Sequence, residues 1–317
     1  MMKRMLMPAL MALCLCACTK KTDTNQTLRV VATVFPAYDW ARIILGAEAG
    51  HAELTLLSNN GIDLHGFQPS VQDSAALSRA DVLIYTGGES DAWVDGAIKT
   101  ATNHAMRTVS LIDALGDRAK AEETVAGMQA DEFDHGGTAY DEHVWLSLQN
   151  APLLCAAIAA HSASADETNA RAYRANLAAY TAELAVLDAE YRAAIGAAAT
   201  KTLVFGDRFP FRYLIDDYGL AYYAAFAGCS AETEASFRTI AFLAEKTDAL
   251  ALPAVLHIET SDGKIARTIV QNTQAKSARV LMLDSMQSVT ARQIAEGATY
   301  LGIMRKNLAV LQEALQK

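Results

Sequence analysis

The chain has 317 residues, of which 52% are hydrophobic and 20% are charged, and its formal net charge is −9. This length accommodates two domains with substantial cores, and the composition excludes a disordered chain. The acidic balance, with no basic stripe along the sequence, argues against nucleic acid as a partner.

The N-terminus has the pattern of a secretory signal. Lys3 and Arg4 precede an almost wholly apolar run that is too short to span a bilayer comfortably. The run ends in a match to a bacterial lipobox, with Cys18 as the residue that would be lipidated. We therefore expect a signal peptide over 1–17 and a lipidated tether over 18–27, which would anchor the protein to the membrane on its extracytoplasmic side.

Short apolar runs then alternate with helical patterns, which is typical of parallel sheets covered by helices. Strands are expected near 28–34, 53–57, 81–86, 107–111, 201–205, 221–226, 252–258 and 279–283. Helices are expected between them, for example from Pro36 to Leu45 and from Pro69 to Arg79. The predicted fold class is α/β, with two lobes that each hold a mostly parallel sheet flanked by helices.

Residues 166–197 have the pattern of one continuous amphipathic helix between the two halves. Apolar residues recur every three to four positions from Tyr173 to Tyr191, with no proline among them. At 1.5 Å per residue such a helix is roughly 45 Å long, enough to run along both lobes. The expected organisation is an N-terminal lobe over 28–165, this linking helix, and a C-terminal lobe over 198–317.

Four candidate metal ligands lie beyond the ends of predicted strands, where ligands bind in open α/β sheets. They are His65 and His143 in the first half and Asp207 and Asp284 in the second. If the lobes face one another, these side chains meet in a single cleft. Imidazole nitrogens and carboxylate oxygens together suit Zn²⁺, and they suit Mn²⁺ as well.

The two aspartates could also have structural roles instead of binding a metal. Asp207 could instead form an ion pair with Arg208 beside it, and Asp284 could cap a turn. Glu234 and Glu259 could substitute for them, since both are expected in loops or at strand ends.

Two further segments bear on metal chemistry. The loop from Gln129 to Gly137 is acidic and contains a histidine, so it is either a solvated loop or a weak metal-collecting segment. Cys155 and Cys229 could form a disulfide in an exported protein, although the apolar helical run around Cys155 favours simple packing. Because no C-x-x-C pair occurs, we expect a metal site built from nitrogen and oxygen.

Several stretches resemble a known family. Val31-Ala-Thr-Val-Phe-Pro-Ala-Tyr-Asp39, Asp63-Leu-His-Gly-Phe-Gln-Pro-Ser70 and Asp141-Glu-His-Val-Trp-Leu-Ser147 are similar to motifs of the metal-specific solute-binding lipoproteins of bacterial zinc and manganese ABC importers, the cluster A-I family. The resemblance runs from about Arg29 to the C-terminus, and Glu142 replaces the proline that is usual in the third motif.

The resemblance implies a metal held between two N-lobe histidines and two C-lobe ligands, with one rigid helix joining the lobes. By motif, His65 and His143 take the histidine roles and Asp284 the C-terminal carboxylate role. The remaining position, usually His or Glu, falls at Arg208, which cannot bind a cation. Asp207 is the nearest replacement, and three protein ligands with water would also be acceptable chemistry.

The function implied is capture of a divalent metal, zinc first, and its delivery to an ABC-type permease by a monomeric protein that is not an enzyme. Manganese or iron is the alternative cargo. Asp63, Asp141 and Glu142 are candidates for fixing the imidazole orientations. A zinc hydrolase is a rival, but neither H-E-x-x-H nor G-x-S-x-G occurs. A surface adhesin with the same fold is the other rival.

Overall fold

A computed structural model of the chain describes four stretches of sequence, which are residues 27–46, 50–129, 139–230 and 234–316. The expected signal peptide, the lipidation residue Cys18 and nearly all of the acidic loop after Gln129 lie outside these stretches. Within them, every helix is either too short or too polar to cross a bilayer.

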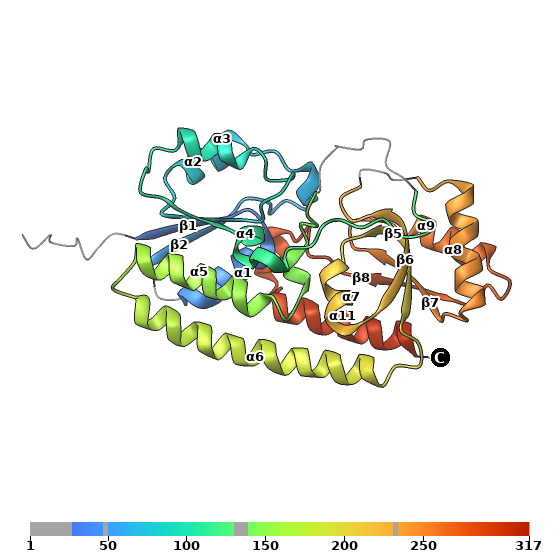
Figure 1. The fold of residues 1–317 in the computed structure, drawn as a ribbon. Coiled ribbons are helices and arrows are strands. Elements are labelled where there is room, and N and C mark those ends of the chain that lie inside the picture. Colours follow the sequence, from blue (N-terminus) through green and yellow to red (C-terminus); the bar gives the residue numbers. More distant parts are fainter. Residues whose placement is uncertain (1–26, 47–49, 130–138, 231–233, 317) are drawn as a thin grey trace, which may run out of the picture.

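The first half of the chain forms a parallel sheet with helices on both faces (Figure 1). In spatial order its strands are β2 (Ala52–Leu56), β1 (Leu28–Ala32), β3 (Val82–Tyr85) and β4 (Arg107–Ser110). The central strands β1 and β3 are nearly continuous aliphatic runs, because helices cover both faces of the sheet.

The helices of this lobe follow the strands in sequence. They are α1 (Phe35–Leu45), α2 (Val71–Ser78), α3 (Val94–Thr100), α4 (Leu111–Leu115) and α5 (Ala151–Ala165), with short 3₁₀ turns η2 (Leu64–Gly66), η3 (Gly116–Arg118) and η4 (Val144–Leu146). Helix α1 begins with Pro36 in its first turn and ends at Gly46, whose left-handed conformation (φ 68°) closes the last turn. The turns η2 and η4 carry or adjoin the two candidate histidines.

The second half repeats the arrangement. Its parallel sheet has the order β6 (Ala221–Ala227), β5 (Thr202–Phe209), β7 (Ala254–Ile258) and β8 (Arg279–Leu283). The helices are α7 (Arg212–Tyr218), α8 (Phe237–Ala249), α9 (Lys264–Asn272), α10 (Ala291–Ala295) and α11 (Tyr300–Leu315). Strand β5 is longer than predicted because, beyond an irregularity between Phe205 and Arg208, it continues to pair with β6.

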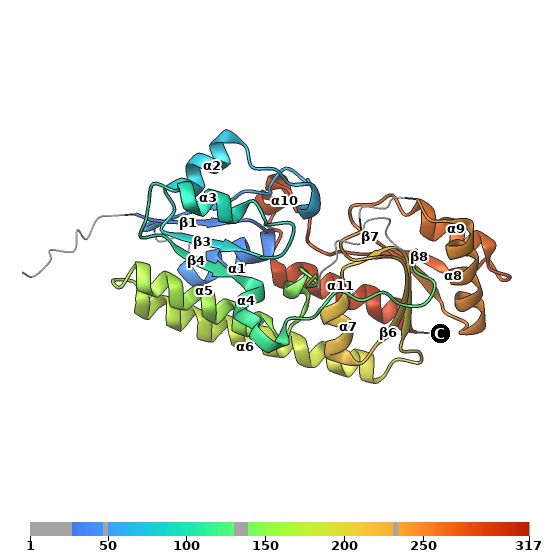
Figure 2. The same ribbon diagram turned by 45° about the horizontal axis from the view of Figure 1, so that its top comes forward.

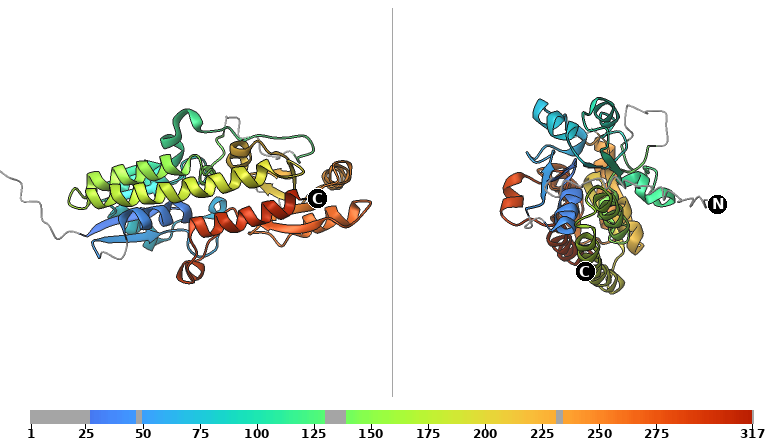
Figure 3. Two further views of the ribbon diagram at one scale, coloured as in Figure 1. Left: turned by 90° about the horizontal axis from the view of Figure 1, so that it is seen from below. Right: turned by 90° about the vertical axis from the view of Figure 1, so that its left-hand side faces the viewer.

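Helix α6 (Ala170–Gly196) joins the lobes and lies along both of them (Figures 1 and 3). It packs against α1 and α5 in the N-terminal lobe and against α7 and α11 further along. The chain also crosses back after β8, since the nitrogen of Ala291 at the start of α10 donates to the carbonyl of Asn59 at 2.7 Å (Figure 2). The two lobes are therefore connected by several segments.

One large hydrophobic cluster extends through both lobes. Trp40 and Trp145 of the N-terminal lobe, Tyr180 of α6 and Phe205 and Tyr300 of the C-terminal lobe belong to the same buried cluster. Removal of this large apolar surface from water is the dominant stabilising contribution. The relative position of the lobes is thus fixed by packing as well as by α6.

The partly buried carboxylate of Asp217 also connects the lobes, and we expect it to make the stability of the protein depend on pH. Asp217 of α7 accepts hydrogen bonds from the hydroxyl of Ser147 at 2.7 Å and the nitrogen of Gln149 at 3.3 Å. Burial raises the pKa of Asp217 to about 6 despite these hydrogen bonds, and Asp188 adds to the rise. The folded protein therefore binds this proton more tightly than the unfolded chain, so the stability it contributes at low pH is lost as pH rises through 6.

In the Asp217→Asn variant the loss of stability with rising pH should disappear, because asparagine stays neutral while it still accepts a hydrogen bond. Relative to the wild type, the variant should gain about 1 kcal/mol of unfolding free energy between about pH 5 and pH 7.5. Urea unfolding of both metal-free proteins across this range measures the difference. Parallel pH profiles for the two proteins would contradict the expectation.

Candidate metal centre

His65 is held in a fixed orientation by its own turn and by a neighbouring loop. It lies in η2, where the carboxylate of Asp63 accepts a hydrogen bond from its backbone nitrogen at 3.0 Å. Its ring Nδ1 is 2.7 Å from the hydroxyl of Ser90, and Glu142 lies 3.8 Å from the same nitrogen. With Nδ1 engaged, Nε2 is the nitrogen that faces His143.

His143 is completely buried and immediately precedes η4. Asp141 accepts hydrogen bonds from both its backbone nitrogen (2.9 Å) and its Nδ1 (2.8 Å). Because a carboxylate only accepts, Nδ1 carries the hydrogen and Nε2 of the neutral ring presents its lone pair. Asp141 therefore plays the orienting role expected from the sequence.

The two Nε2 atoms lie 3.4 Å apart. Two imidazole nitrogens bound to one tetrahedral zinc ion at 2.0–2.1 Å would be separated by about 3.3 Å. The imidazoles thus already have the spacing that such an ion requires, with their remaining nitrogens tied to Asp141 and Ser90.

The pKa values of the two imidazoles are shifted in opposite directions. Burial, together with the neighbouring His143, lowers the pKa of His65 to about 3, so that this ring is neutral at physiological pH. Burial alone would lower the pKa of His143 as well, but the Asp141 carboxylate outweighs it and the pKa is raised. A cation that binds here therefore competes with a proton at His143.

The C-terminal lobe contributes two groups to this site that the sequence analysis did not select. Cys229 follows the end of β6, and its sulfur together with one ligand atom from each of His65 and His143 forms a group whose members all lie within 4.8 Å of one another. Gln287 lies beyond β8 with its Oε1 3.2 Å from Nε2 of His143. Cys229 lies beyond the carboxyl end of its strand, so the rule that selected the aspartates could also have found it.

Asp207 and Asp284 are engaged elsewhere, and among the described residues neither joins the group around the imidazoles. Asp207 lies within β5, where its carboxylate accepts hydrogen bonds from the backbone nitrogen of Ile258 and from Ser261. Asp284 accepts one from the backbone nitrogen of Met286 at 2.8 Å, which is the turn-capping role left open above.

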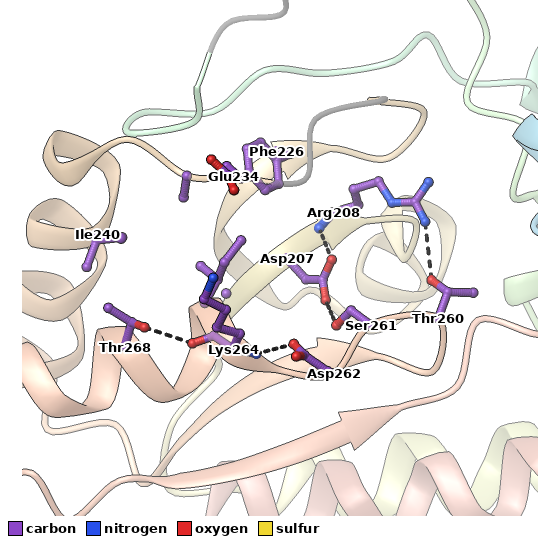
Figure 4. A pocket seen from close by; sticks show the side chains of 13 residues that line it. Asp207, Arg208, Phe226, Glu234, Ile240, Thr260, Ser261, Asp262, Lys264 and Thr268 are labelled. Carbon is purple, nitrogen blue, oxygen red and sulfur yellow. Dashed lines mark hydrogen bonds between the residues drawn. The ribbon is translucent and has the colours of Figure 1, made fainter.

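The two alternative carboxylates, Glu259 and Glu234, also form contacts elsewhere. Glu259 is partly buried and accepts hydrogen bonds from Ser285 and from the backbone nitrogen of Gln287, so it fixes the loop that carries Gln287. Glu234 lines a cavity of about 470 Å³ between α8, α9 and β5, together with Asp207 (Figure 4).

Arg208 does not ligate but connects the lobes. Its Nη2 lies 2.7 Å from Oδ2 of Asp63, the residue that caps the turn of His65, and 3.2 Å from the hydroxyl of Thr260. Adjacent residues of a strand point to opposite faces, so Arg208 extends toward Asp63 while Asp207 turns toward Ser261. Figure 4 shows the side chain of Arg208 beside Thr260 and the carboxylate of Asp207 beside Ser261. The Arg208 guanidinium also helps to hold the pKa of Asp63 below its usual value, against the effect of burial.

The two cysteines of the described residues are both free. Cys155 is buried in α5, in agreement with the packing role favoured by the sequence. The disulfide between Cys155 and Cys229 is not formed, which leaves the thiol of Cys229 available to the site.

Comparisons with known proteins identify relatives that cover most of this chain. The zinc-binding lipoprotein AdcA of Streptococcus pneumoniae is 28% identical over 323 residues, which cover 98% of this chain and 60% of that protein. The high-affinity zinc uptake system protein ZnuA of Bacillus subtilis is 27% identical over 301 residues, which cover 92% of this chain and 88% of that protein. The chain spans only about three fifths of the length of the streptococcal relatives.

A solved structure shows the same fold. The crystal structure of the Zn(II)-bound ZnuA-like domain of S. pneumoniae AdcA superposes with a TM-score of 0.72 at 25% identity, covering 92% of this chain and all of that domain. Residues 30–314 match a single family model, described as zinc-uptake complex component A, periplasmic. The chain thus belongs to this family of uptake-complex components, which is not a family of enzymes.

Proposed function

We propose that this protein captures Zn²⁺ outside the cytoplasm and delivers it to an ABC-type permease, while lipid on Cys18 anchors it to the membrane. The observation that supports this most directly is the pair of imidazole Nε2 atoms 3.4 Å apart, in an orientation fixed by Asp141 and Ser90. A ligand set that is preorganised in this way binds an ion without the cost of rearranging the protein.

The family and the relatives named for zinc support zinc as the cargo. Ligand chemistry points the same way. Two neutral imidazoles favour zinc over manganese, since nitrogen donors bind zinc more strongly and manganese prefers carboxylate and carbonyl oxygens. Delivery requires that the ion leave again, and the side chain of His65 is partly exposed to solvent whereas His143 is fully buried.

Metal content and selectivity test the proposal. Protein purified without chelator should contain about one zinc ion per chain by elemental analysis, and titration of the metal-free protein should give an affinity for Zn²⁺ at least about 100-fold higher than for Mn²⁺. Absence of any bound metal, together with no binding in the titration, would refute metal capture. A preference for Mn²⁺ would keep the function and change the cargo.

A further inference from the structure

We propose that the thiolate of Cys229 is a metal ligand, so that the C-terminal lobe contributes sulfur to the site in place of a carboxylate. This inference rests on the proposed function and specifies how the metal is bound. Among the described residues, Cys229 is the one ionisable side chain of the C-terminal lobe that joins His65 and His143 in a group of ligand atoms within 4.8 Å.

The backbone places Cys229 at the site. Its nitrogen donates a hydrogen bond to the carboxylate of Glu122 in the N-terminal lobe at 2.8 Å, which fixes the turn after β6 against that lobe. The preceding Gly228 lets this turn approach the imidazole closely. A Cβ at Gly228 would lie 2.9 Å from the carbonyl of Phe209 and 3.3 Å from Cε1 of His143. The turn is therefore packed directly onto the ring of a metal ligand.

Gln287 supplies the fourth group. Its amide nitrogen donates to the hydroxyl of Ser285 at 2.8 Å, and that hydroxyl in turn donates to Glu259. These hydrogen bonds fix which end of the amide points into the site, so the carbonyl oxygen faces Nε2 of His143 at 3.2 Å. Nitrogen and oxygen ligands of a tetrahedral zinc ion are separated by about 3.4 Å, so the carbonyl has a suitable position.

The resulting set is two imidazole nitrogens, one thiolate sulfur and one amide oxygen. On binding, the thiol proton of Cys229 is displaced to solvent and a Zn–S bond of about 2.3 Å forms. Thiolate is a soft ligand that favours zinc and disfavours manganese. The sulfur therefore gives a chemical basis for zinc selectivity at a site where Asp207 and Asp284 are engaged elsewhere.

Cobalt substitution tests the sulfur ligand directly, because a Co²⁺–thiolate bond produces a near-ultraviolet charge-transfer absorption that nitrogen and oxygen ligands do not. The variants are Cys229→Ser, which keeps the size of the side chain, and Cys155→Ala, which removes a cysteine buried in α5 and serves as the control. The Co²⁺ complexes of the wild type and of Cys155→Ala should show the absorption. The complex of Cys229→Ser should lack it.

Zinc titration of the same three proteins provides the second readout. Cys229→Ser should bind Zn²⁺ at least about 10-fold more weakly than the wild type, because removing a residue that binds the metal directly lowers the affinity more than removing one that only orients a ligand. Its affinity for Mn²⁺ should change little. Unchanged absorption and unchanged zinc affinity in Cys229→Ser would overturn the inference while leaving zinc capture intact, whereas a wild type that binds neither metal would overturn both.

Discussion

Replacing His143 by alanine should lower the affinity for Zn²⁺ by more than about 100-fold. Losing a residue that only orients a ligand lowers metal affinity by up to about 100-fold, and losing the ligand itself should lower it further. His143 is fully buried, and its Nε2 lies within 3.4 Å of both His65 Nε2 and Gln287 Oε1. Its removal therefore takes away the ligand at the centre of the site. His65→Ala should have an effect of the same order, and isothermal titration with Zn²⁺ measures both.

His104→Ala is the matched control, since this histidine is exposed in a turn before β4. It should bind Zn²⁺ as the wild type does. If His143→Ala and His104→Ala had the same affinity, the assignment of the imidazole pair would be wrong. Circular dichroism of each variant establishes that a loss of binding is not a loss of folding.

Trp145→Ala should destabilise the metal-free protein by about 3–5 kcal/mol, the usual cost of removing a large buried aromatic ring. Trp145 is fully buried, and its indole nitrogen donates to the carbonyl of Ser285 in the other lobe at 2.9 Å. Its own carbonyl accepts a hydrogen bond from the hydroxyl of Tyr300 at 2.7 Å. The ring therefore supports both the lobe contact and the loop of Gln287.

Trp145→Phe separates the contribution of ring packing from that of the indole hydrogen bond, because it keeps most of the packing and leaves the Ser285 carbonyl without its donor. We expect a smaller loss of about 1–3 kcal/mol for this variant. Urea unfolding of the metal-free proteins measures both values, and the absence of metal avoids stabilisation by binding. A loss below about 1 kcal/mol in Trp145→Ala would show that the lobes are held together without this side chain.

The fold was predictable from the sequence to a large extent because its strands are aliphatic runs separated by amphipathic helices. The run predicted at 279–283 coincides with β8, and the helix predicted over 166–197 is α6 at Ala170–Gly196. The main difference is β5, which extends to Phe209 where the sequence indicated an end at Phe205. Because residues 207 and 208 are polar, the sequence did not indicate that β5 continues to pair with β6 beyond Phe205.

That difference explains why Asp207 lies in a different position from the one expected. Asp207 was expected beyond a strand end, but it lies inside β5 and its carboxylate points toward Ser261. Asp284 does follow its strand, yet its carboxylate caps the turn to Met286. Whether a carboxylate at a strand end faces a ligand or its own backbone depends on local hydrogen bonds, and a pattern of residue types does not contain that information.

The sulfur ligand was missed for a different reason. The expectation of nitrogen and oxygen ligands relied on the absence of a C-x-x-C pair, which is the sign of a site formed within one segment. Cys229 meets His65 and His143 only through the tertiary structure, because it belongs to the other lobe. The proximity of the two histidines could be expected because each is embedded in a recognisable motif, whereas Cys229 and Gln287 stand alone in their loops.

The hydrophobic core shared by both lobes limits which halves of related chains can be combined into one folded protein. Tyr180 and Leu184 of α6 and Tyr300 and Met304 of α11 pack into the same cluster as residues of both sheets. A chimera that joined the front half of this chain to the rear half of a relative would have to match this entire surface. Recombination between relatives should therefore preserve α6 and α11 together, so that the halves are inherited as one unit.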